Sequence, residues 1–174
     1  MSTLPADAVG VVPPVLVEPA RPADHQRIGE LTVRVYSDGG YGAPEYVPTL
    51  ADVAGRAALS RLLVARDARG VVVGSVALVL DGVLGEVLTS PQEAGFRMLV
   101  VDPAARGHGV GELLVRSCLE QATAAGKTAV VISTEPTMSA AHRIYERLGF
   151  TRLPERDWSP HPGVDLLVYR RALP

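Results

Sequence analysis

The chain has 174 residues, of which 47% are hydrophobic and 21% are charged. These values are typical of a soluble globular domain, and they exclude a collagen-like chain, a fibrous repeat and a chain that is disordered throughout. Seventeen basic and nineteen acidic residues give a net charge of −2. This balance indicates no basic surface of the kind that binding to duplex nucleic acid requires.

The sequence indicates a reducing compartment and no membrane segment. Cys118 is the only cysteine, so an internal disulfide is excluded. The first arginine is Arg21, so the N-terminal stretch lacks the positive start of a signal peptide. The longest apolar stretch, residues 71–80, is too short to cross a bilayer. We therefore expect a cytoplasmic protein without a membrane partner.

Hydrophobic periodicity and turn residues predict the elements in chain order. Residues 1–14 are rich in Pro, Ala and Gly and should form a weakly ordered lead-in to a single domain over residues 15–174. We expect a strand at 15–17, a helix starting at 22–24, a helix at 49–59, strands at 62–65, 71–80 and 95–101, a helix at 109–125, a strand at 129–133, a helix at 138–148, and strands at 150–153 and 164–171. Residues 158–163 should form a loop. This order predicts a mixed α+β sheet with helices on both faces.

One segment points to chemistry, because an apolar strand runs there into a glycine-rich turn that opens a helix. Gly107, Gly109 and Gly111 permit positive φ angles and a close approach of the backbone to a ligand. The first N–H groups of the helix lack internal partners and, with the helix dipole, form a seat for an anion. Arg106 adds a positive charge. The turn is not a P-loop, because Glu112 follows the last glycine where a P-loop has Lys, and its glycine spacing differs from the dinucleotide fingerprint.

Two motifs together resemble the GNAT family, the GCN5-related N-acetyltransferases. The pattern Arg106-x-x-Gly109-x-Gly111 resembles the Arg/Gln-x-x-Gly-x-Gly/Ala signature of that family. About forty residues later, the helix that ends in Tyr-Glu-Arg-Leu-Gly-Phe at residues 145–150 is similar to the second signature. The resemblance covers roughly residues 95–153, and the order of the elements extends it over most of the chain.

The resemblance implies the GNAT fold, with a mixed, mostly antiparallel sheet of six or seven strands, about four flanking helices and a splayed strand pair that binds the cofactor. It also implies acetyl-CoA as co-substrate and acetyl transfer to an amine by direct attack in a ternary complex, with no metal. The cofactor-binding residues that it implies are Leu99, Val100, Val101, Arg106, Gly107, His108, Gly109, Val110, Gly111, Ser139 and Tyr145.

Tyr145 occupies the position of the family's frequent general acid, which protonates the leaving thiolate. A backbone N–H of Val100 or Val101 would stabilise the oxyanion. Tyr145 also shares an apolar helix face with Ile144 and Leu148, which predicts a place in the core. The two roles are compatible, because the ring can pack while the hydroxyl faces the sulfur.

The general base is open. Family members often use a carboxylate near the start of the cofactor-binding strand, which makes Glu93 the first candidate and Glu135 and Glu86 the next. Each of these could instead be an ordinary solvated carboxylate. An acceptor amine of low pKa would need no base at all.

Several other positions have two interpretations. Met138 stands where many relatives have Asn, and Ser133 or Ser139 could replace that donor. His108 could contact a phosphate or simply face solvent. Cys118 lies on an apolar helix face, where core packing is its expected role.

The acceptor site should lie in the variable helix-loop region that carries Tyr36, Tyr41 and Tyr46. Trp158 could line the acceptor cleft or cover the core. The acceptor could be a small amine, an antibiotic or a protein amine, and the chain a monomer or a homodimer. Two alternatives to an enzyme of this kind are a non-catalytic acyl-CoA-binding or regulatory module on the same fold, and a dinucleotide-binding protein.

Overall fold

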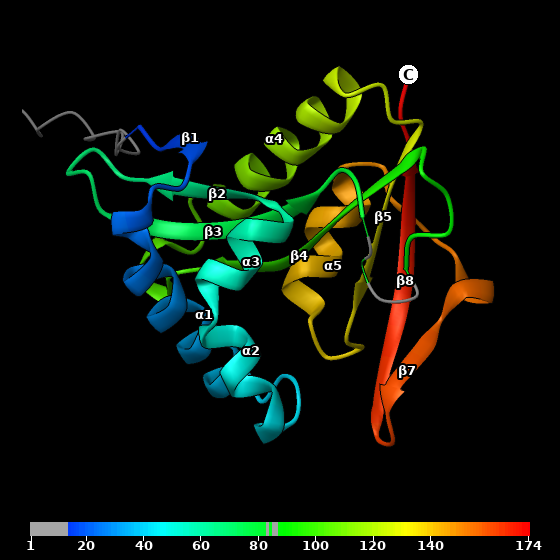
Figure 1. Ribbon diagram of the computed structural model, residues 1–174, viewed down its shortest axis with the longest axis horizontal. Coiled ribbons are helices and arrows are strands. Elements are labelled where there is room, and N and C mark those ends of the chain that lie inside the picture. Colours follow the sequence, from blue (N-terminus) through cyan, green and yellow to red (C-terminus); the bar gives the residue numbers. More distant parts are fainter. Residues whose placement is uncertain (1–13, 83, 85–86) are drawn as a thin grey trace, which may run out of the picture.

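The computed structural model describes residues 14–82, 84 and 87–174 (Figure 1). The expected lead-in, apart from Pro14, lies outside the described residues. The strands are β1 (Leu16–Pro19), β2 (Arg61–Arg66), β3 (Val72–Val79), β4 (Glu93–Val101), β5 (Ala129–Thr134), β6 (Thr151–Arg152), β7 (Trp158–His161) and β8 (Val164–Ala172). The helices are α1 (His25–Gly39), α2 (Val47–Ala51), α3 (Val53–Leu59), α4 (Val110–Ala124) and α5 (Ser139–Arg147).

The strands form one mixed sheet in the order β1-β2-β3-β4-β5-β8-β6, with β7 paired to β8. Only the β4–β5 pair is parallel among the described strands, so the expected mixed, mostly antiparallel sheet is confirmed. The sheet has eight strands, because part of the expected loop at 158–163 forms β7, where Trp158 pairs with Leu166. Pro160 within β7 favours a loop in the sequence, but an edge strand tolerates proline.

The expected helix at 49–59 is two helices, which makes five helices in the described chain where about four were expected. Asp52 has a non-helical backbone (φ −75°, ψ 75°), and its carboxylate accepts a hydrogen bond of 2.9 Å from the N–H of Gly55. Asp52 therefore ends α2 and caps α3. Within the described residues, no helix has the length and apolar content that crossing a bilayer requires.

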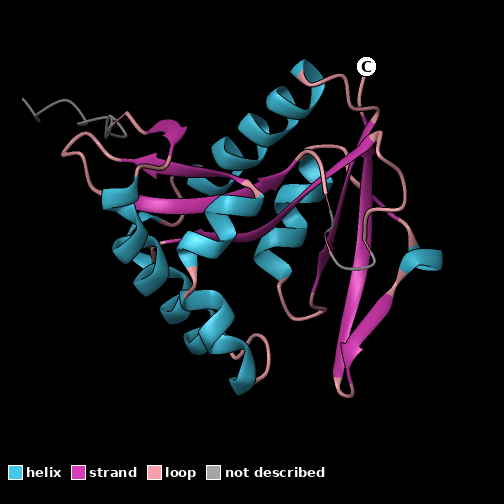
Figure 2. Ribbon diagram, in the orientation of Figure 1, coloured by secondary structure: helices cyan, strands magenta, loops and turns pink. Residues whose placement is uncertain are grey.

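Helices lie on both sides of the sheet (Figure 2). The core is divided between the two faces, as strand alternation requires. Leu63 and Ala65 of β2 pack with α4 and α5, whereas Leu62 and Val64 pack with α1 and α3. Cys118 is fully buried in the cluster beneath α4, which confirms its expected place in the core.

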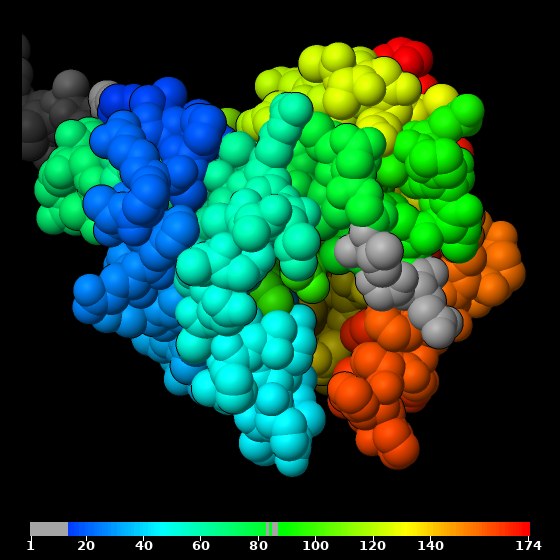
Figure 3. All heavy atoms as spheres, viewed as in Figure 1, coloured from blue at the N-terminus to red at the C-terminus, as the bar shows by residue number. Residues whose placement is uncertain are grey.

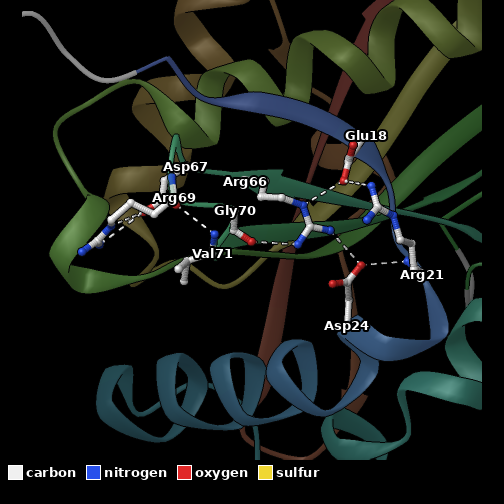
Figure 4. A network of polar contacts seen from close by, with 8 residues as sticks. All are labelled: Glu18, Arg21, Asp24, Arg66, Asp67, Arg69, Gly70 and Val71. Atoms are coloured by element: carbon white, nitrogen blue, oxygen red, sulfur yellow. Dashed lines mark hydrogen bonds and ion pairs between the residues drawn. The ribbon is translucent and has the colours of Figure 1, made fainter.

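An arginine network fixes the start of α1 to the first strands (Figure 4). Arg66 of β2 donates to Glu18 of β1 at 2.8 Å and to Asp24 at 3.0 Å. Asp24 also accepts a hydrogen bond of 2.8 Å from the backbone N–H of Arg21. These contacts set the orientation of α1, the helix that carries Tyr36 toward the centre of the sheet.

Candidate active site

A β-bulge lies in the middle of β4. Ala77 of β3 pairs with Arg97, but Ser75, two residues earlier in β3, pairs with Val100, so β4 contains one extra residue. The bulge includes Met98, whose φ of 54° is the only positive φ of a non-glycine residue in the described chain. Such a conformation costs about 1–3 kcal/mol and is kept where the surrounding structure requires it.

The bulge changes which side chains face which side of the sheet. Before it, Phe96 packs in the cluster beneath α4 and α5; after it, Leu99 and Val101 pack against that same cluster. Val100 faces the other side and packs with Leu31 of α1. The alternation along β4 is thus shifted by one residue, which is the geometric consequence of the extra residue.

The strands β4 and β5 separate after a short parallel segment. Figure 1 shows the two strands diverging. Among the described residues only Glu93 with Ala129 and Ala94 with Val130 are paired. At the next residue, a Cβ on Gly95 would lie 2.6 Å from the carbonyl oxygen of Val131, so only glycine fits at this close approach. Beyond Gly95 the two strands diverge, which confirms the expected splayed pair and leaves a gap beside the bulge.

The end of β4 leads into the glycine turn. Gly107 (φ 80°) and Gly109 (φ 76°) adopt the left-handed conformation that favours glycine, and Gly109 caps α4 without a side-chain hydrogen bond. Arg106 and His108 are exposed beside them. The turn and the N-terminus of the 15-residue helix α4 therefore present backbone N–H groups and a guanidinium to solvent, the donor set that suits a pyrophosphate.

Gly111 has a different role in the same motif. A Cβ at this position would lie 2.9 Å from Cδ1 of Ile144, so the glycine allows α4 to pack closely on α5. The loop before the turn is held by Asp102, whose carboxylate accepts hydrogen bonds from the N–H of Ala104 at 3.0 Å and ion-pairs with Arg34 of α1 at 3.0 Å. Both contacts hold the glycine turn in place at the end of β4.

A cavity of about 830 Å³ opens beside the bulge. Its walls come from the segment between α1 and α2, from β4, from the end of β5 and from the β7–β8 hairpin. Figure 3 shows the hollow between α2, in cyan, and the hairpin, in orange. Met98 lines this cavity, so the bulge forms part of its wall.

The structure brings most of the expected acceptor residues to this cavity. Tyr36, Tyr46 and Trp158 line it. Tyr41 instead packs edge-on against Tyr36, with the ring centroids 6.1 Å apart, and is not among the lining residues. Burial raises the pKa of Tyr36, so its phenol is neutral at physiological pH.

Tyr145 lies in an aromatic cluster behind β4. Its ring is 5% exposed, and its centroid lies 5.9 Å from that of Phe96, 5.6 Å from Phe150 and 6.0 Å from Tyr169. The expected place in the core is thereby confirmed. Burial raises the pKa of Tyr145, so the hydroxyl keeps its proton at neutral pH, as a proton donor must.

Glu93 occupies a different environment from the one expected of a general base. It is 7% exposed and does not line the cavity; its carboxylate is held by Arg156 at 3.1 Å and by the N–H of Thr89 at 3.1 Å. Burial alone would raise the pKa of Glu93, but these donors outweigh it and lower the pKa. A carboxylate stabilised in its charged form is a poor proton acceptor, so the structure argues for a structural role.

Glu135 and Ser133, by contrast, line the cavity. Glu135 accepts a hydrogen bond of 2.7 Å from the N–H of Gly42, which joins the end of β5 to the loop after α1. Ser139 is exposed at the first turn of α5 and does not line the cavity. Met138 lines it, and its sulfur accepts a hydrogen bond of 3.4 Å from the hydroxyl of Thr134. Glu86, the remaining candidate base, lies outside the described residues.

Sequence reasoning missed two arginines. Arg97 of β4 lines the cavity, and Arg56 of α3 is 3% exposed. A signal for Arg97 was present, because a charged residue between Phe96 and Met98 interrupts an otherwise apolar strand. No such signal marks Arg56, whose burial depends on how α3 packs.

Residues 26–150 match the family model described as the acetyltransferase (GNAT) family. The chain belongs to the GNAT family. The human N-acetylaspartate synthetase is 36% identical over 98 residues, which are 53% of this chain and 32% of that protein, so the chain spans about a third of that relative.

Two solved structures show the same fold. A GCN5-related N-acetyltransferase from Kribbella flavida has a TM-score of 0.70 and 28% identity, and the match covers 91% of this chain and 98% of that one. The protein yncA from Salmonella typhimurium, solved with its cofactor acetyl-CoA, has a TM-score of 0.68 and 22% identity, with 92% and 94% covered.

Proposed function

We propose that this GNAT-family chain transfers the acetyl group of acetyl-CoA to an amine by direct attack in a ternary complex. One observation carries the proposal, and it concerns the bulged strand β4. This strand separates from β5, leads into the glycine turn of α4, and contributes Met98 to the wall of a cavity of about 830 Å³. The two ligands would approach the bulge from opposite sides, acetyl-CoA through the gap and the amine through the cavity. We also propose residues 15–174 as one catalytic domain.

The chain offers a complete set of donors for acetyl-CoA, which would supply an activated thioester. The backbone of Leu99, Val100 and Val101 would pair with the pantetheine arm. The residues for the pyrophosphate would be Arg106, Gly107, His108, Gly109, Val110 and Gly111. These groups fit, because the turn is open and a Cβ at Gly107 or Gly109 would meet no atom within 4 Å.

Three groups would act on the reacting atoms. A backbone N–H of Val100 or Val101 would donate to the carbonyl oxygen as it becomes an oxyanion. Tyr145 would donate its proton to the departing sulfur. Glu135, on the cavity wall, replaces Glu93 as our candidate to accept the proton of the attacking ammonium.

Acetyl-CoA binding is tested by thermal unfolding with acetyl-CoA, CoA or NAD. A ligand at 100 times its Kd stabilises the folded state by about 2.7 kcal/mol. For a domain of this size we expect Tm to rise by roughly 5–10 °C with acetyl-CoA or CoA and to stay unchanged with NAD. A shift with NAD alone would favour the dinucleotide-binding alternative.

Turnover is tested by detecting the free thiol of CoA while a library of primary amines is offered. Release of thiol that depends on both the amine and the protein supports the proposal. A Tm shift with acetyl-CoA but no thiol release with any amine would favour the non-catalytic acyl-CoA-binding module.

A further inference from the structure

We infer that the acceptor carries a carboxylate as well as its amine, and that Arg97 binds this carboxylate inside the cavity. This inference rests on the proposed acetyl transfer and names the class of acceptor: a small amino acid with an apolar side chain. The inference follows from the lining of the cavity: Arg97, whose buried Nε has no partner in the described chain, the acidic residues Glu45 and Glu135, and several apolar side chains.

Arg97 lacks a counter-ion among the residues that the structure describes. It lines the cavity, yet its Nε is buried and has no hydrogen-bond partner among the described residues. No carboxylate of residues 14–82, 84 and 87–174 forms an ion pair with it. Burying a guanidinium donor without a partner is costly, so a ligand that pairs with it would be strongly favoured.

Arg56 of α3 does not line the cavity, but it adds a second positive charge that Arg97 is near enough to affect. It is 3% exposed, donates from Nη2 to the carbonyl of Leu50, and has a buried Nε without a partner in the described chain. Burial and then the neighbouring charge of Arg97 lower the pKa of Arg56. Elsewhere the fold pairs its partly buried arginines with acids, as Arg66 pairs with Asp24. Neither Arg56 nor Arg97 forms an ion pair with a described carboxylate, and among the carboxylates only the charge of Asp52 acts in the opposite direction on Arg56. The positive charge of the two guanidinium groups is therefore only partly compensated within the described residues.

The groups around Arg97 indicate which charged groups a ligand of the cavity would carry. Tyr36, Arg97 and Glu135 line the same cavity. A carboxylate suits the planar donor fork of an arginine. Glu135 attracts the ammonium group. A positive and a negative group in one cavity favour a zwitterion over a simple amine.

The β7–β8 hairpin forms a mostly apolar wall, with His161 as its polar side chain. Trp158, Val164 and Leu166 of the β7–β8 hairpin line it. Such a wall suits an aliphatic or aromatic side chain, because apolar area removed from water contributes about 25 cal/mol per Å². The three parts of an apolar amino acid thus match three parts of the cavity.

The test compares acceptors that differ only in the carboxylate: leucine, leucinamide and isoamylamine, and the equivalent set built on phenylalanine. We expect the amino acids to have the highest kcat/KM. The amide is a stringent control, because its amine has a lower pKa than that of the amino acid. If only the reactivity of the amine set the rate, the amide would react faster than the amino acid. Equal or better turnover of the amides and plain amines would overturn the inference while leaving the proposed acetyl transfer intact.

Substitutions of Arg97 then test whether this side chain binds the carboxylate of the acceptor. In R97Q we expect kcat/KM for the amino acid to fall by about 10- to 100-fold, with that for isoamylamine and the acetyl-CoA Tm shift unchanged. R97K should restore part of the loss, because it returns the charge without the fork. R61Q, at an exposed arginine on β2, should have no effect. An equal loss for the amino acid and for isoamylamine in R97Q would contradict the assignment.

A binding measurement keeps the inference separate from turnover. With CoA present, leucine or phenylalanine should raise the Tm of the wild type and not of R97Q. Failure of both amino acids to stabilise a protein that CoA does stabilise would overturn the inference. Failure of acetyl-CoA and CoA to stabilise the chain would instead overturn the proposed function.

Discussion

Tyr145 lies in the core and is also our proposed general acid. Its ring packs against Phe96, Phe150 and Tyr169, and burial raises the pKa of its hydroxyl. The residue was located by its motif, since the spacing from Gly149 and Phe150 is local in the sequence. The ion pair of Glu93 could not be predicted in this way, because its partner Arg156 is 63 residues away in the chain.

At the residue scale, we predict that Y145F lowers kcat by on the order of 100-fold, the usual contribution of a positioned general acid. The acetyl-CoA Tm shift should be nearly unchanged, because the ring and its packing remain. Steady-state kinetics and thermal unfolding check both statements. Y169F is the matched control, since it removes a hydroxyl from the same aromatic cluster and should retain turnover. Full activity in Y145F would exclude the tyrosine as the acid.

At the element scale, the elements that follow from local patterns could be predicted and those that depend on distant partners could not. Glycines at 126 and 149 mark the ends of α4 and α5 from the sequence alone. The break at Asp52 was missed because it depends on a side-chain cap rather than on Gly or Pro. The bulge at Met98 was missed because it is a property of the register between β3 and β4.

At the element scale, we predict the contribution of the Asp52 cap to stability. D52A should lower the free energy of unfolding by about 1 kcal/mol, because the N–H of Gly55 loses its acceptor. Urea unfolding measures the change. D38A, at an exposed carboxylate near the end of α1, is the control and should stay within about 0.5 kcal/mol of the wild type. An unchanged midpoint in D52A would show that the cap contributes no stability.

Across the whole molecule, ion pairs join segments that are far apart in the chain. Asp24 pairs with Arg66, Glu93 with Arg156, and Asp102 with arginines of α1. In each carboxylate the arginine and backbone donors outweigh the effect of burial, so its pKa lies below the ordinary value. Such pairs cannot be assigned from one sequence, because seventeen basic and nineteen acidic residues allow many combinations.

The lowered pKa values predict a loss of stability in acid. The unfolded chain takes up protons at the ordinary carboxyl pKa, near 4, whereas the folded chain takes them up only at lower pH. Stability should therefore be constant from about pH 7 to pH 5 and fall below that as the unfolded state is protonated first. Urea midpoints across this range measure the effect. In D102N the free energy of unfolding should fall less steeply with decreasing pH than in the wild type. A steeper fall would contradict a lowered pKa of Asp102 in the folded state.

The divergence of β4 from β5 has a consequence for self-association. Past Gly95, each strand has one edge without a neighbouring strand, and such edges usually invite another chain to add to the sheet. Proteins commonly protect them with charge or proline. Here the two edges lie inside the strand order, because β3 pairs with the other edge of β4 and β8 with the other edge of β5. A further strand would have to enter between two strands of the same sheet, so this geometry opposes self-association through these edges.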